Sequence, residues 1–100
     1  MFARMSILEG SPDQVDEGLR HVREQVLPFM QQQDGFKGFI ALADRQSGKV
    51  IGVPLWESEQ AMRASEEAGD RARGDSAQVV SASVVGVERY EVGLFEMSNQ

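Results

Sequence analysis

The chain lacks several residues on which protein chemistry often depends. Among its 100 residues there is no cysteine, one histidine (His21) and one tryptophan (Trp56). Without cysteine the chain forms no disulfide and carries no thiol nucleophile. A single histidine, with no carboxylates clustered at ligand spacing, argues against a metal site. We therefore expect no metal to be bound.

Positive charge and long apolar runs are also scarce. Ten lysines and arginines face sixteen aspartates and glutamates, which gives a net charge of −6. This balance disfavours nucleic acids and anionic membranes as partners, since phosphates are bound by basic patches. No apolar run approaches the roughly 20 residues of a membrane helix, and MFARMSILEG has no signal-peptide core. We expect a cytoplasmic protein.

What is present fits a single globular domain. The sequence is 41% hydrophobic and 26% charged, which is ordinary for a folded protein. One hundred residues leave no room for a second core. We expect one domain over residues 1–96, followed by a flexible tail over residues 97–100.

Two helices are predicted. The first begins at Ser11-Pro12, a capping residue followed by a proline, and continues as an apolar stripe to Met30. Pro28 lies inside this stripe and predicts a kink or an early stop. The second helix is predicted to be capped by Ser58 and to present small residues on its inner side. Residues 75–83 fit either another helical turn or a loop.

Four strands are predicted, at residues 2–8, 36–43, 49–56 and 84–95. The resulting β-α-β-β-α-β order indicates a ferredoxin-like α+β fold, with a four-stranded antiparallel sheet and both helices on one face. The second and third strands are apolar on both faces, whereas two helices cover only one. We expect a second copy of the chain to cover the other face. The alternative is that the C-terminal segment folds back over it.

The sequence offers several candidate site residues. Trp56 ends the third strand, on the face that alternation turns away from the helices, where it either stacks on a flat ligand or fills a dimer core. Pro54 predicts a bulge nearby, which leaves the direction of Trp56 open. Arg4, in the first strand, either forms an ion pair with Glu88 or Glu91 or anchors a ligand.

The remaining candidates lie on the second and fourth strands. Tyr90 and Arg89 point to opposite faces of the fourth strand. Tyr90 belongs either to the core or to a cleft, and Arg89 either to an interface salt bridge or to the rim of a site. Phe36 and Ile40, on the second strand, are apolar contacts that a substrate could use.

Several stretches resemble the antibiotic biosynthesis monooxygenase superfamily of dimeric α+β barrels. The resemblance spans nearly the whole chain and is carried by FAR at 2–4, GSPDQVDEG at 10–18, DGFKGF at 34–39, DRQSGK at 44–49, LWES at 55–58 with AMRAS at 61–65, and VERYEV at 87–92. It implies a homodimer that forms a barrel through the sheet face.

The resemblance also implies a choice of activities. Some members oxygenate polycyclic aromatic substrates with molecular oxygen and without a metal or flavin, and others degrade haem. Haem-degrading members resemble this chain at Trp56 but use a first-strand asparagine and a second-helix histidine that are absent here. The resemblance therefore favours a cofactor-independent monooxygenase acting on a small flat aromatic or polyketide-like substrate. Trp56, Arg4 and Tyr90 would be the catalytic candidates, and Trp56, Phe36, Ile40 and Arg89 would contact the substrate. The alternative is a non-catalytic ligand-binding or assembly dimer.

Overall fold

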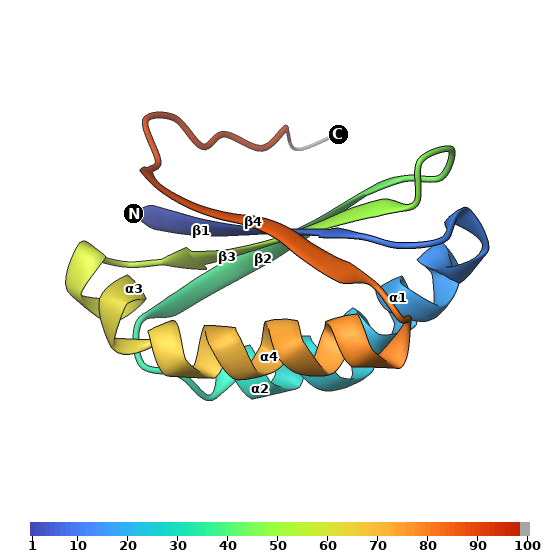
Figure 1. The fold of residues 1–100 in the computed structure, drawn as a ribbon. Helices are drawn as coiled ribbons and strands as arrows, with labels where there is room; N and C mark the ends of the chain where they lie inside the picture. Colours follow the sequence, from blue (N-terminus) through green and yellow to red (C-terminus); the bar gives the residue numbers. More distant parts are fainter. Residues whose placement is uncertain (99–100) are drawn as a thin grey trace.

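A computed structural model describes residues 1–98, in which one sheet of four antiparallel strands carries all helices on one face (Figure 1). The strands are β1 Phe2–Glu9, β2 Phe36–Asp44, β3 Lys49–Trp56 and β4 Ser83–Glu91. They lie in the order β2-β3-β1-β4. The predicted ferredoxin-like fold is confirmed, because this order places one helical run after β1 and the other after β3.

The first helical run absorbs its proline instead of stopping at it. It consists of η1 Pro12–Gln14, α1 Val15–His21, η2 Val22–Val26 and α2 Leu27–Gln31. The segment η2 is a π-turn, in which the backbone N–H of Leu27 donates to the carbonyl of Val22. Pro28 has no N–H and its ring crowds the preceding turn, so a widened turn lets the helix continue past it.

The second helical run is broken where a single helix was expected. Helix α3 spans Glu59–Ala64 and α4 spans Glu66–Val79, and Ser65 between them leaves the helical conformation (φ −94°, ψ 7°). The predicted cap at Ser58 is confirmed, since its side chain accepts a hydrogen bond from the N–H of Ala61. The segment whose structure the sequence left open is helical as far as Val79.

Strand β4 ends at Glu91, four residues before the predicted end at Phe95. Its only neighbour is β1, and Phe2 at the start of β1 already pairs with Glu91. The chain then continues on the side of the sheet opposite the helices (Figure 1). Its apolar side chains stay exposed there, Leu94 by 82%. Of the predicted tail, residues 99–100 lie outside the described residues.

Alternation along β3 turns Trp56 toward the helices, which corrects the predicted direction. Pro54 interrupts the ladder with β1, whose pairs run from Ala3↔Leu55 directly to Ser6↔Gly52 without a change of register. The irregularity lies in β2 instead, between Phe36 and Gly38. Parity along β3 is therefore kept, and even-numbered β3 residues face the helical layer.

Trp56 forms the centre of the core between sheet and helices. It is 0% exposed and belongs to a buried cluster with Val26, Met30, Met62 and Ala72. The ring of Phe36 meets it edge-on, with ring centroids 5.8 Å apart. The indole therefore supplies a large share of the buried apolar area of this small domain.

The opposite side of the sheet, called the open face below, is apolar, and no helix of residues 1–98 covers it. Strand pairing places on it Met5, Ile7, Ile40, Leu42, Ile51, Val53 and Tyr90. Leu42 is 48% exposed and Tyr90 is 55% exposed. None of the helices formed by residues 1–98 has the length and apolar character needed to cross a membrane.

Candidate functional site

A cavity of about 70 Å³ lies between the helices and the sheet, and is called the helix–sheet cavity below. Its walls are mainly apolar and come from both layers, including Leu8, Phe39 and Pro54 of the sheet and Val15, Val22 and Met30 of the first helical run. Its polar lining includes Arg4, Ser6 and Arg73. The cavity has room for roughly five water molecules.

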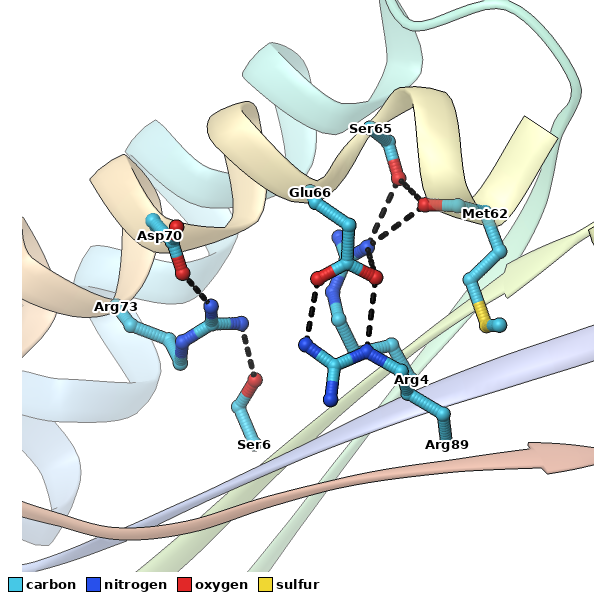
Figure 2. Close-up of polar contacts among 8 residues, drawn as sticks. All are labelled: Arg4, Ser6, Met62, Ser65, Glu66, Asp70, Arg73 and Arg89. Atoms are coloured by element: carbon cyan, nitrogen blue, oxygen red, sulfur yellow. Dashed lines mark hydrogen bonds and ion pairs between the residues drawn. The ribbon is translucent and has the colours of Figure 1, made fainter. Parts of the chain in front are cut away.

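Arg4 is the most unusual residue of this cavity. It is 1% exposed, and its Nη1 donates to the carbonyl of Met62 at 3.2 Å and to the hydroxyl of Ser65 at 2.9 Å (Figure 2). The break between α3 and α4 makes these contacts possible, because it turns Ser65 and the last turn of α3 toward the guanidinium. The predicted partners Glu88 and Glu91 are wrong, since the carboxylate near Arg4 is Glu66 of α4, at 3.5 Å.

Two nitrogens of Arg4 are left over. Within residues 1–98, Nε and Nη2 are buried without a hydrogen-bond partner, as is the indole Nε1 of Trp56. The guanidinium lies 5.4 Å from the centroid of the Trp56 ring, a cation–π contact that holds it in place. Unpaired donors of a buried cation are costly, so Nε and Nη2 of Arg4 are candidates for ligand binding.

Glu66 is held mainly by a different arginine. Arg89 of β4 donates to both of its carboxylate oxygens, from Nε at 2.9 Å and from Nη2 at 2.6 Å (Figure 2). These bonds, with the charges of Arg4 and Arg73 in addition, lower the pKa of Glu66 against the effect of burial. The side chain of Arg89 is 43% exposed, so it lies near the protein surface. Its two hydrogen bonds position the Glu66 carboxylate.

Sequence reasoning missed a second buried arginine, Arg73 of α4. It is 8% exposed, and its Nη1 donates to the hydroxyl of Ser6 on β1 at 3.2 Å while Nη2 pairs with Asp70. A signal was available in the sequence. The spacing of four residues places Ser65, Gly69 and Arg73 on one side of the helix. This side of α4 faces Arg4.

These residues form one charged group, called the arginine cluster below: Arg4, Arg73, Arg89, Glu66 and Asp70 (Figure 2). Three guanidinium groups and two carboxylates leave one positive charge. Burial lowers the pKa of Arg4, and the charges of Arg73 and Arg89 add to this, whereas Glu66 opposes it.

The structure divides the predicted site residues between two faces. Arg4, Trp56 and Phe36 lie on the helix side of the sheet, and Arg89 reaches that side through Glu66. Tyr90 and Ile40 lie on the open face. The hydroxyl of Tyr90 donates to Glu88 at 2.6 Å, and this bond raises the pKa of Tyr90. Within a single chain these residues do not form one site.

One further feature is a weaker candidate. A groove of about 560 Å³ runs between the first helical run and the edge strand β2, but its charged residues, Arg23 and Lys37, are exposed to solvent. Within residues 1–98, no three histidine or acidic side chains come together in a way that could hold a metal ion.

Comparison with solved structures identifies the fold. The chain has the fold of the antibiotic biosynthesis monooxygenase superfamily, as its resemblance predicted. A putative antibiotic biosynthesis monooxygenase from Deinococcus radiodurans matches it with a TM-score of 0.70 at 19% identity over 100% of both chains. No family model matches the sequence.

Two solved structures of this fold have stated activities. The heme-degrader MhuD of Mycobacterium tuberculosis matches with a TM-score of 0.74 at 21% identity, over 97% of this chain and 100% of that one. The monooxygenase ActVA-Orf6 of Streptomyces coelicolor, in complex with Nanaomycin D, matches with a TM-score of 0.68 at 19% identity, over 97% and 92%.

In sequence, the chain is more similar to an uncharacterised protein, Rv2558 of Mycobacterium tuberculosis (strain ATCC 25618 / H37Rv). The two are 40% identical over 94 residues, which cover 94% of this chain and 39% of that protein. The chain thus spans about two-fifths of the length of this relative.

Proposed function

We propose that this chain is a cofactor-independent, monooxygenase-like protein that binds a small flat aromatic substrate in the helix–sheet cavity. The observation that carries the proposal is Arg4, a buried guanidinium with two unpaired donors on an otherwise apolar cavity. Such a group favours the anionic form of a bound substrate, because it offers charge and hydrogen bonds that water no longer supplies.

The anion is what makes a cofactor unnecessary. An activated methylene next to a phenol loses a proton and becomes an electron-rich carbanion or enolate, which can give an electron to molecular oxygen. The balanced reaction is R₂CH₂ + O₂ → R₂C=O + H₂O, in which the substrate supplies all the electrons. Arg4 would hold the anion, and the apolar walls would exclude water.

The other candidate residues receive different roles in this proposal. Trp56 and Phe36 fix the Arg4 guanidinium and the buried end of the cavity, since Trp56 contacts both the arginine and the phenyl ring. Arg89 positions Glu66. Tyr90 and Ile40, on the open face, would act only where a second copy covers them.

The comparisons support the reaction class and leave the substrate open. One protein of this fold is a monooxygenase crystallised with Nanaomycin D, and another is a heme-degrader. The 70 Å³ cavity would have to widen to admit a single ring, and a polyketide-sized or haem-sized ligand would need the helices to move further from the sheet. We place the protein in the cytoplasm as a homodimer that joins its open faces.

The second candidate function is a non-catalytic ligand-binding or assembly dimer. It is favoured by the small volume of the cavity and by the exposed apolar residues of the open face. In that case the cavity would bind a ligand without oxidising it.

Oxygen uptake by the purified protein with a panel of quinol-type and anthrone-type substrates tests the proposal. We expect uptake with equimolar ketone or quinone product, and a loss of at least about tenfold in kcat for Arg4→Lys, because lysine keeps the charge and loses the planar fork. The control Arg63→Lys changes an exposed arginine on α3 and should have no effect. Trp56→Phe separates packing from chemistry. Equal rates for Arg4→Lys and the unchanged protein, or no uptake with any substrate, would contradict the proposal.

A further inference from the structure

The unpaired donors of Arg4 belong to one edge of its guanidinium. Its Nη1 makes all the contacts to Met62, Ser65 and Glu66, whereas Nε and Nη2, which lie side by side, make none within residues 1–98. The Nε–Nη2 edge offers two parallel N–H groups, and this geometry matches the two oxygens of a carboxylate.

Helix α4 packs closely against this part of the guanidinium at Gly69. A Cβ atom on Gly69 would lie 2.7 Å from Nη2 and 2.8 Å from both Cζ and Nε. A side chain at position 69 would therefore collide with the Arg4 guanidinium and displace its unpaired nitrogens. On the same helix, a Cβ on Gly74 would have nothing within 4 Å, so glycine is not required throughout α4 for packing.

The charges around the edge call for an anion. The two carboxylates that face the cluster are already engaged, Glu66 by Arg89 on both oxygens and Asp70 by Arg73. Arg4 is the most buried member of the arginine cluster, and its one carboxylate neighbour, Glu66, lies at 3.5 Å from Nη1 and bonds mainly to Arg89. Buried donors without a partner are unfavourable, and a ligand carboxylate would supply the missing hydrogen-bond acceptors together with a closer negative charge.

We propose that the helix–sheet cavity is specific for aromatic carboxylates, and that the carboxylate binds the Nε–Nη2 edge of Arg4 beneath Gly69. The ring would extend between Phe39, Pro54 and the apolar side of the first helical run, where the cavity is lined by carbon. Arg73, held by Ser6 and Asp70, adds positive charge to the same cavity. This inference deepens the proposed function by naming its substrate class, but the carboxylate site requires no catalysis.

Benzoate and benzamide test this site, because they have the same shape and differ in charge. The protein is titrated with each at pH 7 while the ¹H–¹⁵N signals of the arginine Nε groups and the fluorescence of Trp56, the only tryptophan, are recorded. We expect benzoate to shift the Arg4 Nε signal and to bind at least about tenfold more tightly than benzamide, since the carboxylate forms charge-assisted bonds.

Gly69→Ala and Gly74→Ala form a matched pair, because the first new methyl group would displace the Arg4 guanidinium and the second would meet nothing within 4 Å. Gly69→Ala should abolish the preference for benzoate, and Gly74→Ala should keep it. Equal binding of benzoate and benzamide, binding of neither, or an undiminished preference in Gly69→Ala would overturn the inference. Neither ligand can be oxidised by the reaction above. Benzoate binding without oxygen uptake would therefore contradict the proposed function alone, and oxygen uptake without a preference for benzoate would contradict this inference alone.

Discussion

Gly69 shows at the scale of one residue why the site needs this sequence. Arg4 reaches its buried position only because the residue of α4 above it has no side chain. A helix interior normally disfavours glycine relative to alanine, so glycine here reflects a close contact and not a helix preference. Replacing glycine by alanine at two positions of α4 can therefore change the free energy of unfolding in opposite directions.

Gly69→Ala should lower the free energy of unfolding by about 1–3 kcal/mol, because the new methyl group overlaps the Arg4 guanidinium. Gly74→Ala should raise it by about 0.5–1 kcal/mol, since alanine favours the helix and nothing lies near the new methyl group. Urea denaturation followed by circular dichroism measures both. A stabilising Gly69→Ala would show that the guanidinium does not lie where the structure places it.

Glu66 couples stability to pH. Its pKa is lowered in the folded protein, chiefly by hydrogen bonds from Arg89. The ionised side chain therefore stabilises the fold fully above the pKa of Glu66 in the unfolded chain, and this contribution is lost as the pH falls through the lowered pKa of the folded state.

We expect Glu66→Gln to be less stable than the unchanged protein at pH 7 and to lose less stability on acidification below pH 4.5. Glu67→Gln changes an exposed neighbour that has no ion pair among the described residues, and it should follow the unchanged protein. Urea midpoints measured between pH 3 and pH 7 make the comparison. Parallel curves for Glu66→Gln and the unchanged protein would be inconsistent with the ion pair.

At the scale of elements, local patterns predicted most of the fold. Four apolar strands and two helices were evident because the spacing of apolar residues, and the residues that begin or end an element, are local properties of the sequence. The break at Ser65 and the position of Arg73 were not evident, since they depend on a contact between β1 and α4 about sixty residues apart. The direction of Trp56 was predicted wrongly because alternation shows which residues of a strand share a face, but not which of two apolar faces the helices cover.

The two predicted helix caps behave differently. The Ser58 side chain accepts a hydrogen bond from Ala61, whereas Ser11 makes no side-chain cap bond and pairs with Asp13 instead. Ser58→Ala should therefore lower the free energy of unfolding by about 1 kcal/mol, and Ser11→Ala by less than about 0.5 kcal/mol. Thermal and urea denaturation of both variants provide the test. Equal losses would mean that the capping bond at Ser58 contributes nothing.

At the scale of the whole molecule, the two faces of the sheet differ in what covers them. The face under the helices holds the cavity and the arginine cluster, and the open face presents apolar side chains to solvent. Apolar patches of this kind mark interaction surfaces, and the symmetric way to bury one is against its copy.

Leu42→Glu should separate the two copies, because it places one carboxylate from each copy in the apolar interface between the open faces. Val79→Glu is the matched control, since Val79 is 49% exposed on the helix side and Leu42 is 48% exposed on the open face. Size-exclusion chromatography with light scattering gives the mass of each variant. An unchanged mass for Leu42→Glu, or a halved mass for Val79→Glu, would assign the interface to another surface.

The division of the sheet into a ligand face and a pairing face is tested most directly by sedimentation velocity of the unmodified protein at micromolar concentration. The account predicts a single species of twice the 11.0 kDa chain mass. A species that sediments as one chain across that range of concentration would contradict it.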